Sequence, residues 1–297
     1  MNGFEEMCRV GFAHINFMAG RPQGSPLRNT KPILLMAVFL MACAPARVTQ
    51  SSNTVAASNT GIVSLVVNPN GDTVCVAQNA TSVALFSRAA IRGQSGHDWL
   101  SAPTRVSSAA WLDNTWWFAL PRAGLVQTAV GLPKSVAVLG QPTRLSARHI
   151  LTLEGDVFNF LGSRVTRFSS LPQDVLELPN STYFLVNKEV FVLQNGQTTR
   201  VKELDSAQYS LLPENNSFVA VKGMAVRNAD YTFVLEKSEV RISRNDLNPF
   251  RTISLPSAGS KVAVGGDTLA VAIGSSVMFF DARTFAPLLT RACEVTR

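Results

Sequence analysis

Short runs of apolar and β-branched residues recur along most of the chain, and turn residues bound each of them. Ile62–Val67, Thr73–Ala77 and Ser82–Phe86 are early examples, and residues 190–193 are a later one. The segments between runs are rich in Asn and Gly, as in the Gln-Asn-Gly-Gln stretch at 194–197, which is typical of tight hairpin turns. Beyond residue 61 no stretch of useful length has helical periodicity. This pattern predicts an all-β domain.

The runs also repeat as groups, each with a strand, a polar turn and a strand that ends at a stop such as Leu-Pro. The clearest groups begin at Val157, Val190, Val240 and Val277, and fainter copies lie at Val83 and near Leu125. A period of roughly 40 residues with about four strands per unit is typical of a β-propeller. We therefore expect about six four-stranded blades. The interval between Val190 and Val240 is the longest, and it leaves room for an inserted hairpin or a seventh blade.

A different pattern lies near the N-terminus, where Arg28 and Lys31 precede an apolar run over 33–43. A basic flank and a short apolar segment that ends at a small residue are typical of an export signal, too short to span a bilayer comfortably. The last four residues, Leu40-Met41-Ala42-Cys43, resemble the lipobox of bacterial lipoproteins. The resemblance implies cleavage between Ala42 and Cys43 and attachment of a lipid to the Cys43 thiol. The alternative is that 33–41 is an ordinary buried segment and Cys43 is a core thiol.

These patterns divide the chain into four parts. Residues 1–27 form a non-native or dispensable extension, because a lipoprotein signal begins close to its basic flank; residues 28–42 are the signal peptide. Residues 43–60 are the lipidated Cys43 and a flexible tether, whose Ser, Thr, Asn and Ala cannot bury enough apolar surface to fold. Residues 61–297 are the propeller. The expected location is the bacterial cell envelope, with the domain held on the extracytoplasmic side by membrane lipid.

A second resemblance concerns the propeller itself. Residues 61–88, GIVSLVVNPNGDTVCVAQNATSVALFSR, and residues 266–290 are similar to bacterial YVTN/WD-type repeats in their alternation of turn and strand. The units between them match loosely. This resemblance implies a diverged propeller and no particular activity, because propellers support both enzymes and scaffolds.

The folded domain contains two of the four cysteines, Cys75 in the first unit and Cys293 in the last. The first and last blades of a closed ring are neighbours, so these residues have the opportunity to form a disulfide, which an oxidising compartment permits. The alternative is two separate buried thiols.

Charge and chemistry exclude several classes of function. The formal net charge is +7, but the basic residues are scattered rather than clustered along one element, which argues against a nucleic-acid partner. The domain has two histidines, His97 and His149, and neither has a second ligand at metal-binding spacing. We therefore expect no metal and no cofactor, and the sequence identifies no catalytic residue.

All four tryptophans lie close together, at positions 99, 111, 116 and 117. Trp111 and Trp117 share the same parity, which predicts that they lie on one face of a hairpin and fill the core, with Trp116 on the other face. A sharper hypothesis makes Trp99 or Trp116 an exposed anchor for a protein or a sugar.

Two functions remain. In the first, the propeller is a non-catalytic module that binds an envelope protein or a polysaccharide. In the second, it is a propeller-type hydrolase or lactonase with its site in the central channel. The shortage of histidines and of clustered carboxylates favours the first.

Overall fold

The fold is a β-propeller, seen here in a computed structural model that describes residues 61–94, 96–128, 134–246 and 248–293. The proposed signal peptide, Cys43 and the tether lie outside the described residues. Two short helices accompany the strands, α1 (Arg88–Ile91) and the 3-10 helix η1 (Pro121–Ala123). No helix in the described part of the chain is long and apolar enough to cross a membrane.

Six sheets have four strands each, and we number them as blades 1 to 6 in chain order. Blades 1 and 2 consist of β1 (Ile62–Val67), β2 (Thr73–Ala77), β3 (Ser82–Phe86), β4 (Asp98–Ser101), β5 (Ser108–Leu112), β6 (Thr115–Leu120), β7 (Leu125–Thr128) and β8 (Ser135–Ala137). Blades 3 and 4 consist of β9 (Pro142–Leu145), β10 (His149–Thr152), β11 (Asp156–Asn159), β12 (Arg164–Arg167), β13 (Asp174–Leu178), β14 (Ser181–Val186), β15 (Glu189–Gln194) and β16 (Gln197–Glu203). Blades 5 and 6 consist of β19 (Met224–Arg227), β20 (Tyr231–Glu236), β21 (Glu239–Arg244), β22 (Pro249–Ser254), β23 (Lys261–Gly265), β24 (Thr268–Ile273), β25 (Ser276–Asp281) and β26 (Pro287–Ala292).

A seventh sheet has two strands within the described chain, β17 (Tyr209–Glu214) and β18 (Ser217–Lys222). We call it the short blade. It lies between blades 4 and 5, since β17 contacts β13 on one side and β19 on the other. The long interval between Val190 and Val240 therefore contains a hairpin that occupies a blade position of its own.

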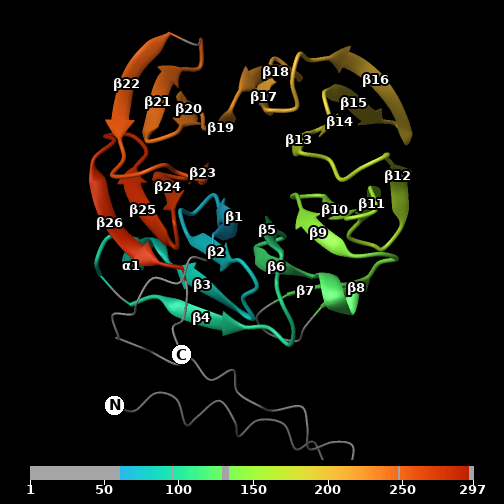
Figure 1. Ribbon diagram of the computed structural model, residues 1–297, viewed down its shortest axis with the longest axis horizontal. Coiled ribbons are helices and arrows are strands. Elements are labelled where there is room, and N and C mark those ends of the chain that lie inside the picture. Colours follow the sequence, from blue (N-terminus) through green and yellow to red (C-terminus); the bar gives the residue numbers. More distant parts are fainter. Residues whose placement is uncertain (1–60, 95, 129–133, 247, 294–297) are drawn as a thin grey trace, which may run out of the picture. The chain divides into compact units, whose positions relative to one another are not determined.

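The sheets are arranged radially around a central axis, with the first strand of each sheet innermost (Figure 1). Every sheet is an antiparallel meander in sequence order, so each blade is built from one continuous segment. The inner strands also meet one another around the ring, as β1 does with β5 and β23.

Tight turns of the predicted kind connect the strands. Asn195 and Gly196 both have positive φ angles, as do Asn215 and Asn216 in the short blade and Asp113 and Asn114 in blade 2. Asn, Asp and Gly tolerate this conformation at low cost, and it matches the twist of paired strands.

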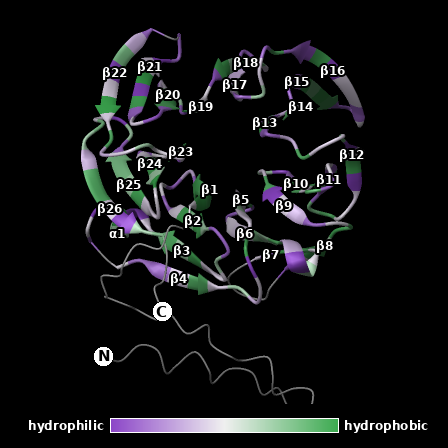
Figure 2. Cartoon of the chain, viewed as in Figure 1, coloured by the Kyte–Doolittle hydropathy of each residue, from purple (hydrophilic) through white to green (hydrophobic). Residues whose placement is uncertain are grey.

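The hydrophobic core consists of separate clusters between adjacent blades. Between blades 1 and 2, for example, Val74 and Val83 pack against Trp116 and Phe118. Second and third strands such as β2 and β25 are largely hydrophobic, whereas the outer strands β12 and β16 are largely hydrophilic (Figure 2).

The ring closes between blade 6 and blade 1, at a junction that we call the seam. Cys75 on β2 and Cys293, just after β26, form a disulfide with a Cα–Cα distance of 5.8 Å. Both cysteines are buried in a cluster that also contains Phe86 and Phe279. Of the two alternatives left open by the sequence, the structure has the bonded pair.

Ion pairs cover the same seam. Arg88 in α1 forms an ion pair with Asp267, and Arg92 lies 2.8 Å from Asp267 and 3.2 Å from Asp281. Burial opposes ionisation of Asp267, but the hydrogen bond from Arg88 and the charges of both arginines outweigh it, so its pKa is lowered.

The disulfide should contribute measurably to stability, because it links residues 218 positions apart. We expect the Cys75→Ala/Cys293→Ala variant to lose about 2–4 kcal/mol of unfolding free energy relative to the oxidised protein. Urea unfolding with and without a reductant measures this. The reduced wild-type protein serves as the control and should resemble the variant. An unfolding midpoint unchanged by reduction would contradict the role assigned to the bond.

Candidate functional site

A cavity of the described chain lies on the propeller axis, lined by the inner strands. It has a volume of about 760 Å³, and residues from all six blades and the short blade line it. This size falls within the ordinary range of small-molecule sites. We call it the central cavity.

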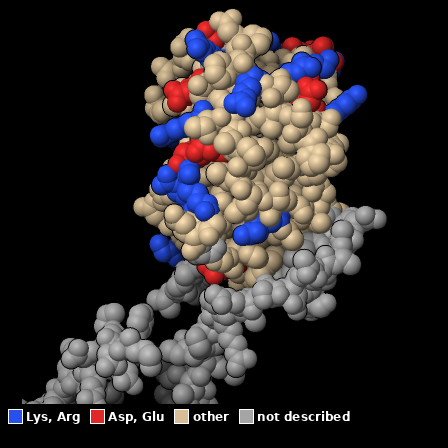
Figure 3. All heavy atoms as spheres, turned by 90° about the vertical axis from the view of Figure 1, so that its left-hand side faces the viewer, with Lys and Arg blue, Asp and Glu red and all other residues tan. Residues whose placement is uncertain are grey.

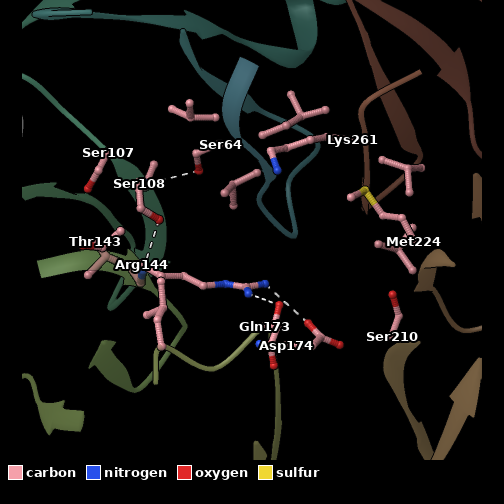
Figure 4. Close-up of a pocket in the computed structure, with 18 of the residues that line it drawn as sticks. Ser64, Ser107, Ser108, Thr143, Arg144, Gln173, Asp174, Ser210, Met224 and Lys261 are labelled. Atoms are coloured by element: carbon pink, nitrogen blue, oxygen red, sulfur yellow. Dashed lines mark hydrogen bonds and ion pairs between the residues drawn. The ribbon is translucent and has the colours of Figure 1, made fainter. Parts of the chain in front are cut away.

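One residue from each inner strand occupies an equivalent position around this cavity. Each pairs across the sheet with an apolar residue of the second strand, as Ser210 does with Val221 and Lys261 does with Ala272. The seven members, which we call the cavity ring, are Ser64, Ser108, Arg144, Asp174, Ser210, Met224 and Lys261. Figure 4 shows their side chains grouped around the cavity.

Most members of the cavity ring bind the inner strand of the next blade. A side-chain oxygen of Ser64, Ser108, Asp174 and Ser210 accepts a backbone N–H from Ala109, Leu145, Leu211 and Ala225, at 3.2, 3.1, 2.6 and 2.8 Å respectively. Since inner strands of adjacent blades do not pair as sheets, these side chains satisfy N–H groups that would otherwise be unbonded.

Arg144 makes the corresponding contact between blades 3 and 4. Its Nη1 donates to the carbonyl oxygens of Pro172 and Gln173, and its Nη2 lies 3.4 Å from Oδ1 of Asp174. Burial raises the pKa of Asp174, while the charge of Arg144 and the N–H of Leu211 oppose this effect. The Asp174 carboxylate therefore already interacts with two groups of the protein, the guanidinium of Arg144 and the N–H of Leu211.

Lys261 and Met224 differ from the other members of the ring. Among the described residues, no acceptor lies within hydrogen-bond distance of Nζ of Lys261. Burial lowers the pKa of Lys261, and the positive charge of Arg144 lowers it further. The side chain of Met224, 38% exposed, offers an apolar surface beside it.

A third cation, Arg105, lines the cavity just before β5. Its Nε is buried, and within the described chain no acceptor bonds to it. The lining therefore contains Arg105, Arg144 and Lys261 against the single carboxylate of Asp174. Burying cations without anionic partners is unfavourable, so this excess is a notable feature of the cavity.

The tryptophan hypothesis needs correction. The Asp113-Asn114 turn has two residues, so Trp111 pairs with Trp116, and their rings lie 4.8 Å apart. Trp116 is 6% exposed and packs between blades 1 and 2, whereas Trp117, also 6% exposed, packs between blades 2 and 3. Trp116 is therefore a core residue rather than an exposed anchor.

Trp99 also belongs mainly to the fold. It is half-buried on β4 and packs against the seam cluster, with its ring 5.3 Å from that of His97. Trp111 and Trp117 were expected on one face of the hairpin, but the two-residue turn at Asp113-Asn114 pairs Trp111 with Trp116 and puts Trp117 on the other face.

The two histidines lie apart from the central cavity. His149 is buried on β10, and its Nδ1 lies 2.9 Å from Oε1 of Glu177, which also accepts from Ser146. This network connects blades 3 and 4. Among the described residues, no group of His, Cys, Asp and Glu has the arrangement of a metal site.

Sequence reasoning missed the cavity ring and Arg105. A usable pattern was present, because Ser108, Asp174, Ser210 and Lys261 each lie four residues before the end of a strand that leads into a hairpin turn.

On the face of blades 5 and 6 that Figure 3 shows, Lys and Arg are interspersed with Asp and Glu.

The comparisons with known proteins concern the fold. No family model matches the chain, and no curated protein matches it. Among solved structures, the computationally designed Ika8 protein is similar with a TM-score of 0.57 and 14% identity, over 81% of this chain and 90% of that one.

PorZ, a bacterial surface component of the type-IX secretion system of Porphyromonas gingivalis, has a TM-score of 0.56 and 12% identity. The match covers 81% of this chain but only 39% of PorZ. At these identities the similarity shows a shared fold and no shared activity.

The polar contacts of the cavity ring can be tested one at a time. Ser210→Ala leaves the buried N–H of Ala225 without its acceptor, so we expect a loss of about 1–3 kcal/mol in unfolding free energy. Chemical denaturation measures it. Ser206→Ala, which removes a contact on the exposed loop before β17, is the control and should change stability by less than about 0.5 kcal/mol. Equal effects of the two substitutions would refute the role of Ser210.

Proposed function

We propose that this chain is a lipid-anchored protein of the bacterial cell envelope, whose propeller binds a partner protein rather than catalysing a reaction. The observation that carries the proposal is the open edge of the short blade. Among the strands of the described residues, β18 pairs only with β17, whereas the second strand of every other blade pairs with a third strand.

The backbone of β18 is directed so that it can accept another strand. The N–H of Leu211 bonds to Asp174 instead of to Ala220 opposite, which identifies Leu211 and Ala220 as a non-hydrogen-bonded pair. The N–H of Gly223 bonds to the carbonyl of Gln208, in agreement with this alternation. The backbone groups of Phe218, Ala220 and Lys222 therefore point away from β17.

This edge differs from the outer edges of the other blades. β16, for example, is exposed along its whole length, and charged residues make up much of it. β18 has four consecutive half-buried residues, Phe218, Val219, Ala220 and Val221. An unpaired strand with an apolar surface favours addition of an extended peptide segment, which gains both backbone hydrogen bonds and apolar contacts.

The enzymatic alternative has less support from the central cavity. Hydrolysis of a glycoside or an ester needs a general acid and a general base whose side chains are free to exchange a proton with the substrate. Of the described residues that line the cavity, Asp174 alone has a carboxylate, and Arg144 and the N–H of Leu211 already engage it. A polysaccharide ligand also loses support, because Trp116 is buried.

The anchor rests on the lipobox resemblance at Leu40-Met41-Ala42-Cys43. We expect bacterial cells that express the chain to incorporate labelled palmitate into it and to retain it in the membrane fraction. Cys43→Ser should abolish both, because the thiol is the attachment point, whereas Cys8→Ser should change neither. Label that persists in Cys43→Ser would refute the anchor.

The edge proposal predicts site-specific crosslinking. A photoreactive residue at Lys222 on β18 should give one defined adduct in cells, while the same residue at Thr199 on β16 should not. Ala220→Pro removes an N–H that points outward, so it should abolish the adduct and leave the fold intact. An Ala220→Pro protein that folds normally and still crosslinks from Lys222 would contradict strand addition.

A further inference from the structure

We propose that the central cavity binds a small organic or inorganic anion, a carboxylate or a phosphate, through Lys261, Arg105 and Arg144. This site is separate from the edge of β18 and does not depend on the function proposed above. It rests on the composition of the cavity lining and on the absence of partners for two of its cations within the described residues.

The hydrogen-bonding capacity of these cations is incompletely used. Arg144 donates to backbone carbonyls and to Asp174, which fixes its guanidinium at the cavity wall. Within the described chain Nζ of Lys261, which lines the cavity, forms no hydrogen bond, and the buried Nε of Arg105 has no acceptor either. Cationic side chains that line a cavity without an acceptor indicate a place for a ligand.

The charge distribution selects the sign of that ligand. Three cations and one carboxylate line the cavity, and the carboxylate already has partners. Figure 4 shows the side chains of Arg144 and Lys261 extending into the cavity from different blades. An anion between them would receive charge-assisted hydrogen bonds and would relieve the repulsion between the two positive charges.

The remaining lining adds a constraint on the ligand. The serine hydroxyls of Ser64, Ser108 and Ser210 are bonded to backbone groups of the next blade. Met224, next to Lys261 in the cavity ring, is 38% exposed and provides an apolar surface. An anionic head group with a short apolar or neutral body therefore fits this lining better than a highly hydroxylated molecule.

Binding can be measured on the full chain by isothermal titration calorimetry in a low-salt buffer. The probes are inorganic phosphate, succinate and glucose 6-phosphate, with glucose as the neutral control. We expect saturable 1:1 binding of at least one anion and none of glucose. Phosphate alone would indicate an inorganic ligand, preference for succinate would indicate an organic one, and preference for glucose 6-phosphate would refute the constraint against hydroxylated ligands.

Variants separate binding in the cavity from adsorption to a basic surface. Lys261→Met and Arg105→Met should each weaken binding at least about tenfold, since each removes a charge-assisted contact. Arg283→Met, at an exposed turn, removes the same charge and should bind like wild type.

A fold control accompanies these variants. Because Lys261 lacks an anionic partner, Lys261→Met should melt at or above the temperature of the unliganded wild-type protein, while the stabilisation that the anion gives to wild type should disappear. No saturable anion binding by wild type would overturn the proposal. Equal losses in Lys261→Met and Arg283→Met would also overturn it, because they would show surface adsorption.

Discussion

Closure of the ring at the seam is the constraint on which the rest of this structure depends. Blades 1 and 6 are each built from one continuous segment, so within the described residues no shared strand joins the first blade to the last by backbone hydrogen bonds. The Cys75–Cys293 disulfide and the ion pairs of Asp267 act at this junction instead. The backbones also approach closely, since a Cβ at Gly265 would collide with the carbonyl oxygen of Asn68. Only glycine fits there, which makes the seam a packed contact as well as a covalent one.

The polar interior of the propeller follows from the same architecture. Inner strands of adjacent blades converge at the axis without forming a common sheet, so some backbone N–H groups there need partners from side chains. Ser64, Ser108 and Ser210 provide acceptors, and Asp174 provides another. Met224 on blade 5 and Lys261 on blade 6 make no such contact within the described chain. Lys261 is thus the member of the cavity ring that retains a free donor.

Much of the fold was predictable from the sequence, because strand alternation and Asn-Gly turns are local properties. The six four-stranded blades agree with the period of the repeats. The face on which Trp116 lies was not predictable by parity alone, since a two-residue turn at Asp113-Asn114 decides which residues pair. The cavity ring was missed because its definition requires knowing which strand of each blade is innermost. Lys261 looks like an ordinary surface lysine until six other strands are placed around it.

The short blade connects the two proposed sites physically. β17 contributes Tyr209 and Ser210 to the lining of the cavity, while β18 presents the open edge. On the side of blade 4, Phe218 packs on Tyr183 with ring centroids 4.9 Å apart. On the side of blade 5, hydrogen bonds join the elements, from Ser210 to Gly223 and from Arg227 to Pro213. A blade with two strands has less apolar surface to bury than its neighbours, so its support is more polar. A strand added to β18 would supply the burial that a third strand gives elsewhere, which is the physical reason to propose a partner there.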